Sequence, residues 1–407
     1  MKILHTSDWH LGQQFMMKNR EPEHRAFLSW LIAQVVSQSV DAVLVAGDIF
    51  DSASPASYAR KLYNDFIINL QNAGCTQLII VSGNHDSVAV LNESKSLLSA
   101  LNVSVLAGLS ETLSDHIVTV KDKKGNQALI CALPFLRASD VMLSEAGTSA
   151  DHKQMTLQQG IANTYQKIYE LALLQKQQAH ATNNIPIIAS GHLTALGCSI
   201  SESVRDIYIG TLTAFPASLF PAFDYIALGH LHRAQKVPKH EHIRYSGSPI
   251  ALSFDETKHQ KQVIIAEFDD KAHLFSTEVN IPTFQKITVL KGTLSTIKSE
   301  LYRLIEVKEP IWVEVKIQES FYRSDVHSEL NEIVADSDVE VLKISSPKID
   351  ENSQLKAEQM ETLEELKPVE LFQYRLACPD ADSISDEQKF ELTQLFAKSC
   401  EELEQKS

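Results

Sequence analysis

Five short stretches of this 407-residue chain end in side chains that commonly bind metal ions. Each begins with an apolar run, passes a small residue and then presents Asp, Asn or His. They are ILHTSDWH (3–10), AVLVAGDIFD (42–51), LIIVSGNHD (78–86), PIIASGH (186–192) and YIALGHLH (225–232). Short apolar runs bounded by Gly and Ser are typical of buried β-strands. The recurrence predicts one site assembled from five strand ends.

The last stretch places two histidines, His230 and His232, two residues apart. Residues at this spacing point the same way on an extended chain but not on a helix, so the pair could reach one common point just after a strand. Gly229 would permit the unusual backbone angles of such an exit. Taken alone, the pair is more typical of two surface histidines after a buried strand, and the recurrence is what favours a site.

Helical spacing of apolar residues separates the early strands, at 27–35 and 58–70, and a longer helical region is predicted from about 151 to 180. Alternating strands and helices predict an α/β fold. In such folds, ligands bind beyond the carboxyl ends of the strands. All five clusters lie there, and we expect them to meet.

The pooled candidate ligands form a set of oxygen and nitrogen donors without sulfur: Asp8, His10, Asp48, Asn84, His192, His230 and His232. Such donors suit Mn, Fe or Zn ions. Seven ligands exceed the three or four that one catalytic ion takes. Because a carboxylate can bridge two ions, two metals sharing Asp48 account for the number. Paired ions about 3.5–4 Å apart activate water and offset phosphoryl charge in phosphoester hydrolysis.

His85 follows Asn84 directly, so its side chain should point away from that of Asn84. We interpret it as a residue that faces the substrate and protonates the leaving oxygen. Asp51 could hold its imidazole in one tautomer. The alternative is that His85 is a further metal ligand.

The composition indicates where in the cell the protein acts and which partners it can bind. The formal charge of −15 has the wrong sign for a nucleic-acid binder, so either the substrate is not nucleic acid or metals and a partner supply positive charge. Five cysteines without a CxxC pair indicate reduced thiols rather than disulfides or a cysteine metal site. The start of the chain has no signal-peptide pattern and no run of about 18 apolar residues occurs, which predicts a cytoplasmic protein without a membrane span.

The pattern changes towards the C-terminus. Strand-like runs at 284–290, 311–317 and 339–344, with helical stretches at about 294–306 and 325–335, predict a small βαβαβ domain, either a cap over the site or a stabilising appendage. Residues 351–407 hold 14 acidic and 6 basic residues and two amphipathic stretches, beginning near Pro368 and Asp386. They are equally typical of a partner-docking helical pair and of a surface tail. We therefore expect three parts, 1–275, 276–348 and 349–407.

The motifs DxH, GDxxD, GNHD, GH and GHxH, in this order, resemble those of the calcineurin-like metallophosphoesterases over roughly residues 1–270. Within that superfamily the chain is most similar to the nuclease subunits of bacterial SbcC–SbcD-type complexes, relatives of the Mre-type DNA repair nucleases. The similarity extends to HTSDWHLGQ (5–13), SPASYAR (54–60), GNHDSVAVLNES (83–94), VRDIYIGTL (204–212) and YSGSPIALSFDE (245–256).

This resemblance implies a two-sheet sandwich flanked by helices, with an α+β cap domain and a C-terminal helical tail. It implies two Mn²⁺ ions, with Mg²⁺ or other divalent ions as alternatives. One ion would be held by Asp8, His10 and His232 and the other by Asn84, His192 and His230. Asp48 would bridge them, and His85 would be the catalytic histidine.

The resemblance also implies an ATP-dependent 3′–5′ exonuclease on double-stranded DNA ends and an endonuclease on single strands and hairpins, acting in DNA repair, recombination and replication of palindromes. ATP would act only through an SbcC-type coiled-coil ATPase, which would bind the tail and supply DNA-binding surface. The chain would be a homodimer within a heterotetramer in the bacterial cytoplasm, associated with the nucleoid. The dimer would form through helices near 58–70 and 88–101, although such helices more often simply face the core. Lys18–Arg20 and Arg205 could touch DNA phosphates or simply be solvated.

Two other functions fit parts of the pattern. One is a phosphatase or cyclic-nucleotide phosphodiesterase on the same dinuclear core, for which the extra domain and tail would be unnecessary. The other is a scaffold without activity, against which the filled set of ligand positions argues.

Overall fold

The computed structural model describes residues 1–75, 77–142, 150–179, 184–204, 214–318, 323–345, 392 and 396. Arg205, most of the motif at 204–212 and all but two residues of the predicted tail lie outside this part of the chain. The description below concerns the compact unit Met1–Pro347.

The first sheet contains the strands that lead to three of the five clusters. Its strands lie in the order β14-β13-β1-β4-β5-β6. β1 (Lys2–Thr6), β4 (Ala42–Ala46), β5 (Gln77–Val81) and β6 (Val103–Leu106) run parallel, and β13 (Gln262–Phe268) and β14 (Leu274–Asn280) complete it in antiparallel fashion. β4 is buried throughout, as its uninterrupted apolar sequence requires of a strand covered on both faces.

The second sheet leads to the other two clusters and has the order β11-β12-β10-β9-β8-β7. Its strands are β7 (Ile117–Lys121), β8 (Gln127–Cys131), β9 (Ile187–His192), β10 (Tyr225–Gly229), β11 (Gln235–Val237) and β12 (His240–Tyr245). β8, β9, β10 and β12 are parallel, so the carboxyl ends of β9 and β10 lie together.

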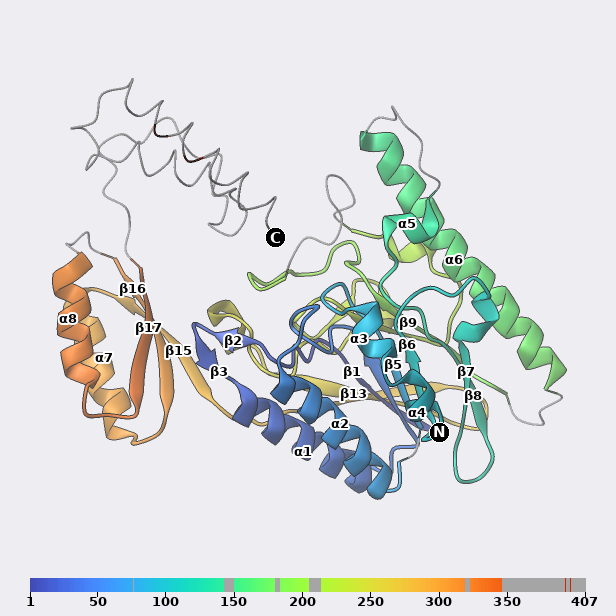
Figure 1. Ribbon diagram of the computed structural model, residues 1–407, viewed down its shortest axis with the longest axis horizontal. Helices are drawn as coiled ribbons and strands as arrows, with labels where there is room; N and C mark the ends of the chain where they lie inside the picture. The colour runs from blue at the N-terminus through green and yellow to red at the C-terminus, as the bar shows by residue number, and fades with distance from the viewer. Residues whose placement is uncertain are drawn as a thin grey trace. The chain divides into compact units, whose positions relative to one another are not determined.

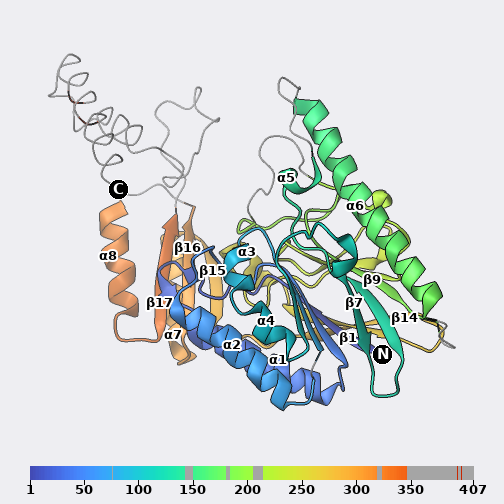
Figure 2. The same cartoon turned by 45° about the vertical axis from the view of Figure 1, so that its right-hand side comes forward.

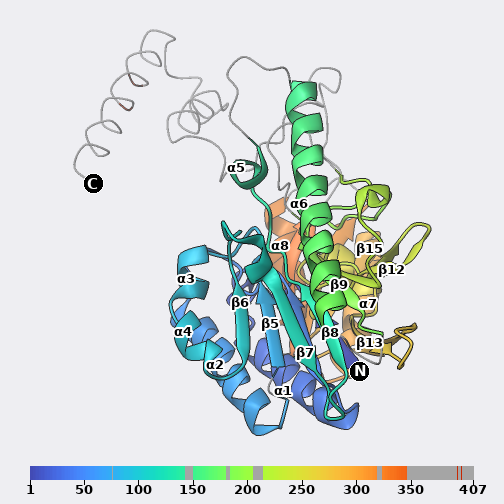
Figure 3. The same cartoon turned by 90° about the vertical axis from the view of Figure 1, so that its right-hand side faces the viewer.

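The two sheets pack face to face and helices cover their outer faces. Apolar side chains of both sheets, among them Leu44, Ile79 and Ile188, form the layer between them. α1 (Glu21–Ser37) and α2 (Ser57–Asn72) cover the first sheet, and α6 (Ala150–Gln178) covers the second, as Figure 3 shows. The predicted two-sheet sandwich flanked by helices is confirmed.

Shorter elements connect these layers. They are the strands β2 (Gln14–Phe15) and β3 (Lys18–Asn19), the helices α3 (Val88–Asn92), α4 (Lys95–Ser99) and α5 (Ala138–Val141), and the 3₁₀ turns Leu113–His116, Ala217–Leu219 and Phe254–Lys258. No helix of the described residues is long and apolar enough to cross a membrane.

A third sheet follows, with the order β15-β16-β17 and parallel strands Lys286–Gly292, Ile311–Ile317 and Val339–Ser345. α7 (Leu294–Glu306) and α8 (Arg323–Val334) pack on one face of it (Figures 1 and 2). This confirms the predicted βαβαβ arrangement. Trp312 on β16 stacks on Phe15 of β2, with ring centroids 5.7 Å apart. The predicted boundary between residues 275 and 276 falls within β14 (Leu274–Asn280). The three-part division of the chain stays a prediction.

Candidate metal centre

The chain leaves its strands in an unusual backbone conformation at the candidate ligands. Asp8, His10, Asp48 and His230 have positive φ values of 54°, 46°, 50° and 96°. Residues with a side chain rarely adopt this region, and it is enriched at functional sites. Main-chain hydrogen bonds hold the turns, since Asp8 N donates to Gly47 O and His10 N donates to Asp48 O, each at 3.0 Å.

The structure gathers six of the seven candidates into two buried groups. Within each group one potential ligand atom per residue lies within 4.8 Å of the others. The first group is Asp8, His10 and His232, and the second is Asp48, His192 and His230. The seventh candidate, Asn84, joins the second group, because its Oδ1 lies 3.0 Å from His192 Nε2.

The Asp48 carboxylate, a member of the second group, also faces the first group. Its Oδ2 is 3.5 Å from His10 Nε2 in the first group and 3.3 Å from His192 Nε2 in the second. Burial by itself raises the pKa of Asp48, but the charge and hydrogen bond of His192 hold that pKa well below its usual range. The position is that of a carboxylate able to touch two ions at once.

The histidines His10 and His192 present the same nitrogen, Nε2, to the centre because their Nδ1 atoms are occupied. His192 Nδ1 donates to the carbonyl oxygen of Ala46 at 3.1 Å, and His10 Nδ1 donates to Asp51 Oδ1 at 3.1 Å. His10 Nε2 is buried and has no hydrogen-bond partner among the described residues. A metal ligand typically has its second nitrogen held in this way, so the donor set fits metal ions.

His230 and His232 do not reach a common point. His232 belongs to the group of Asp8 and His10, whereas His230 belongs to that of Asp48 and His192. The expectation drawn from their spacing is wrong because His230 itself takes the left-handed conformation and the chain turns there. The main-chain N–H of His230 donates to Asp8 Oδ1 at 2.8 Å, which joins the two groups.

Gly229 is required for space rather than for its backbone angles. Its φ lies outside the left-handed range in which several other glycines of the chain are found. A Cβ at this position would lie 1.8 Å from the carbonyl oxygen of Ala46 and 2.9 Å from His192 Nδ1. Only glycine lets β10 approach the end of β4 this closely.

His85 lies beside these groups, half-buried, with its ring 4.8 Å from the His10 ring and nearly perpendicular to it. Its Nδ1 donates to the main-chain carbonyl oxygen of Asp51 at 2.7 Å. The Asp51 carboxylate, expected to hold this ring, accepts from His10 Nδ1. His85, His10 and Asp51 also form a potential ligand group, so the geometry leaves both interpretations of His85 open.

Sequence reasoning missed two buried carboxylates that organise the centre, although both lie within the quoted motifs. The first, Asp86, accepts hydrogen bonds from the main-chain N–H groups of Ile49, Phe50 and Gly83 at 3.1, 2.9 and 2.8 Å. It thereby ties the turn after β5 to the turn after β4. Burial and the charge of Asp48 raise the pKa of Asp86 to about 6.

The second missed carboxylate is Glu256, which lies beside His232 and pairs with Lys261 at 2.6 Å. Burial opposes its charged form, but Lys261 and His232 hold the pKa of Glu256 well below its usual range. Arg20, a suggested contact for DNA phosphates, is instead 1% exposed and paired with Glu23 at 2.6 Å, so that suggestion is wrong.

Comparison with known proteins agrees with the motifs and the geometry. Residues 1–234 match the calcineurin-like phosphoesterase family, and residues 283–378 match the Type 5 capsule protein repressor C-terminal domain. The SbcD subunit of the SbcCD nuclease of Escherichia coli K12 is 43% identical over 405 residues, which cover 99% of this chain and 98% of the relative. This chain belongs to the SbcD family of calcineurin-like phosphoesterases.

Two further SbcD proteins are similar to a smaller share of the chain. The SbcD subunit of the SbcCD nuclease of Rhodobacter capsulatus is 36% identical over 280 residues, 66% of each chain. That of Bacillus subtilis is 27% identical over 322 residues, 78% of this chain and 79% of the relative. The resemblance inferred from the motifs is confirmed.

Proposed function

We propose that this chain is a Mn²⁺-dependent DNA nuclease, the SbcD component of an SbcC–SbcD-type complex. It would degrade double-stranded DNA ends as an ATP-dependent 3′–5′ exonuclease and cut single strands and hairpins as an endonuclease. The position of Asp48, with one carboxylate oxygen facing a histidine of each ligand group, is the observation that carries the proposal. The family membership supports DNA as the substrate.

The two ions would be held by residues that the fold already brings together. Asp8, His10 and His232 would hold the first, and Asn84, His192 and His230 would hold the second, with Asp48 shared. The set of carboxylate, amide and imidazole donors suits Mn²⁺ and also admits Mg²⁺ or other divalent ions. Such ion pairs polarise the phosphoryl group and activate the attacking water.

The chain's own acid would be His85. Its Nδ1–H is fixed on the carbonyl oxygen of Asp51, which orients the ring. In the imidazolium form Nε2 also carries a proton, which it would give to the leaving oxygen, leaving a neutral ring. Asp51 serves twice in this arrangement, since its carbonyl oxygen orients His85 and its carboxylate orients His10. The half-buried position of His85 leaves its ring accessible from solvent.

An SbcC-type coiled-coil ATPase as partner would resolve the conflict between the charge of −15 and a DNA substrate. It would supply the ATP hydrolysis and positive surface, and the segment 349–407 would bind it. We further propose a homodimer within a heterotetramer, a capping role for residues 276–348, and action at the bacterial nucleoid in repair, recombination and replication of palindromes.

The test is cleavage of an end-labelled DNA duplex with Mn²⁺, with and without an SbcC-type partner and ATP. Wild type should cut, and His85→Ala should retain two ions per chain while losing activity by about 10² to 10⁴-fold, the range for a general acid. His273→Ala, which changes an exposed surface histidine, is the matched control and should cut normally.

Two results would contradict the proposal. Loss of an ion in His85→Ala would make His85 a ligand rather than the acid. Hydrolysis of a phosphomonoester or cyclic nucleotide, with no cleavage of DNA under any condition, would keep the metal chemistry but assign a small substrate.

A further inference from the structure

A chain of polar contacts lies behind the ring of His232. His232 Nδ1 lies 2.5 Å from Ser203 Oγ, and the same hydroxyl contacts Glu256 Oε1. Because a carboxylate only accepts, the hydroxyl donates to Glu256 and the imidazole Nδ1–H donates to the hydroxyl. Glu256 Oε1 itself lies 3.4 Å from His232 Nδ1. The contacts fix the ring with Nε2 directed to the first ligand group.

Glu256, on the 3₁₀ turn Phe254–Lys258, is almost fully buried, at 1% exposure. Its Oε1 accepts from Ser201 Oγ at 3.0 Å, and its Oε2 accepts from Leu252 N at 3.1 Å. A buried carboxylate with this many donors has a single orientation. Its burial is tolerable only because a cation faces it.

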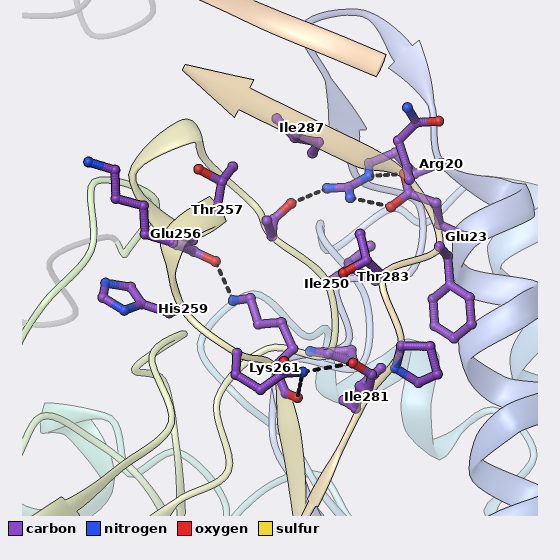
Figure 4. Close-up of a pocket in the computed structure, with 17 residues that line it drawn as sticks. Arg20, Glu23, Ile250, Glu256, Thr257, His259, Lys261, Ile281, Thr283 and Ile287 are labelled. Atoms are coloured by element: carbon purple, nitrogen blue, oxygen red, sulfur yellow. Dashed lines mark hydrogen bonds and ion pairs between the residues drawn. The ribbon is translucent and has the colours of Figure 1, made fainter. Parts of the chain in front are cut away.

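That cation is Lys261, which also binds the main chain of His232. Its Nζ donates to Glu256 Oε2 at 2.6 Å, to Ser248 Oγ at 2.7 Å and to the main-chain carbonyl oxygen of His232 at 3.1 Å. The three hydrogens of the ammonium group are therefore all used. The pair lies in the wall of a cavity of about 280 Å³ (Figure 4).

The position of Lys261 in the fold connects the two sheets. Lys261 immediately precedes β13, which pairs with β1, the strand that leads to Asp8 and His10. His232 follows β10 in the other sheet. The Lys261–Glu256 pair thus fixes a ligand of the second sheet relative to two ligands of the first. Ile281, which follows β14, donates its N–H to Lys261 O at 2.8 Å and holds this lysine at the main chain.

We propose that Glu256 and Lys261 are positioning residues of the metal centre, which hold the ring and the main chain of His232 so that the ion shared with Asp8 and His10 binds tightly. The inference rests on the proposed dinuclear function. Outer partners of ligating histidines contribute about 10 to 100-fold to metal affinity. The second group has a different support, the Ala46 carbonyl behind His192, so the effect should be confined to one ion.

The test is Mn²⁺ titration of the metal-free full-length protein, by calorimetry and by electron paramagnetic resonance. Wild type should bind two ions and show the signal of a coupled pair. Glu256→Gln should bind one ion about 10 to 100-fold more weakly, with the signal of an isolated Mn²⁺ before the second ion enters. Lys261→Met should weaken the same ion. Glu267→Gln, which removes an exposed carboxylate paired with Lys2, is the matched control.

Ser203→Ala is a second test in case the buried variants do not fold, since it removes only one half-buried hydroxyl. It should weaken the binding of the same ion. The inference would be overturned if Glu256→Gln bound two ions as tightly as Glu267→Gln does. If Glu256→Gln does not fold, unchanged ion binding by Ser203→Ala would overturn the inference. Equal weakening of both ions would also overturn it. A wild type that binds fewer than two ions would instead overturn the proposed function.

Discussion

Replacement of Asp86 tests whether one buried carboxylate organises the turns that carry the candidate ligands. Asp86→Ala would leave three main-chain N–H groups, those of Ile49, Phe50 and Gly83, without their acceptor. Each unsatisfied buried group costs about 1–3 kcal/mol, so we expect a loss of at least about 3 kcal/mol. This is a large fraction of the typical stability of a folded protein, about 5–15 kcal/mol.

Asp86→Asn should cost less. Its amide oxygen can replace Oδ2, which accepts from both Ile49 and Gly83, while its NH₂ group would face the N–H of Phe50. One unsatisfied donor predicts a loss of about 1–3 kcal/mol. The order of stability should therefore be wild type, then Asn, then Ala.

The assay is urea unfolding with a chelator present, monitored by tryptophan fluorescence. Trp9 is a suitable probe because it is fully buried, with its ring centroid 5.1 Å from that of Phe66. Asp65→Asn, at an exposed i,i+4 ion pair with Lys61, is the control and should change stability by less than about 0.5 kcal/mol. The reasoning would be refuted if Asp86→Ala resembled this control, or if Asn were as destabilising as Ala.

Two further predictions concern packing and pH. Gly229→Ala should lower the free energy of unfolding by about 1–3 kcal/mol or more, because its Cβ would overlap the Ala46 carbonyl. The control is Gly108→Ala, whose Cβ would make ordinary contact with Val88 and whose stability should stay within about 1 kcal/mol of wild type. Equal effects of the two substitutions in urea unfolding would contradict the steric argument. Burial, aided by Arg20, lowers the pKa of His24 to about 3. Unfolding then takes up a proton below the unfolded pKa of about 6.5, so the contribution of His24 to stability is fully present above that pH and is lost as the pH falls towards 3. The leucine of His24→Leu cannot titrate. As the pH falls from about 6 to 4, the stability of this variant relative to wild type should therefore rise by about 1.4 kcal/mol per pH unit. A constant difference across that window would show that His24 titrates normally.

Much of the fold could be predicted from the sequence because the pattern is local. Apolar runs that end in Gly or Ser identified the strands β1, β4, β5, β9 and β10. Helical spacing identified α1, α2 and α6, and the order of strands and helices identified the third sheet. The carboxyl ends of neighbouring parallel strands lie together, so the gathering of ligands within each sheet followed from the strand assignments. The packing of two sheets against each other was implied only by the family resemblance.

The errors arose where the two sheets contact each other. Glycine is needed at position 229 because of the carbonyl oxygen of Ala46, which is distant in sequence. The two-residue spacing of His230 and His232 does not show their separation, which depends on a backbone angle and was implied only by the family resemblance. Glu256 and Arg20 read as ordinary charged residues. Their burial follows from the partners Lys261 and Glu23, and only the folded chain shows that both pairs are withdrawn from solvent.

The most direct test of the central claim is the metal content of wild type and Asp48→Ala, measured by elemental analysis after loading with Mn²⁺ and removal of free ions. Because Asp48 faces both ligand groups, wild type should retain two ions per chain and Asp48→Ala should lose both. The exposed-site variant Asp65→Asn should retain two. Two ions in Asp48→Ala, or one ion in wild type, would contradict a dinuclear centre shared through Asp48.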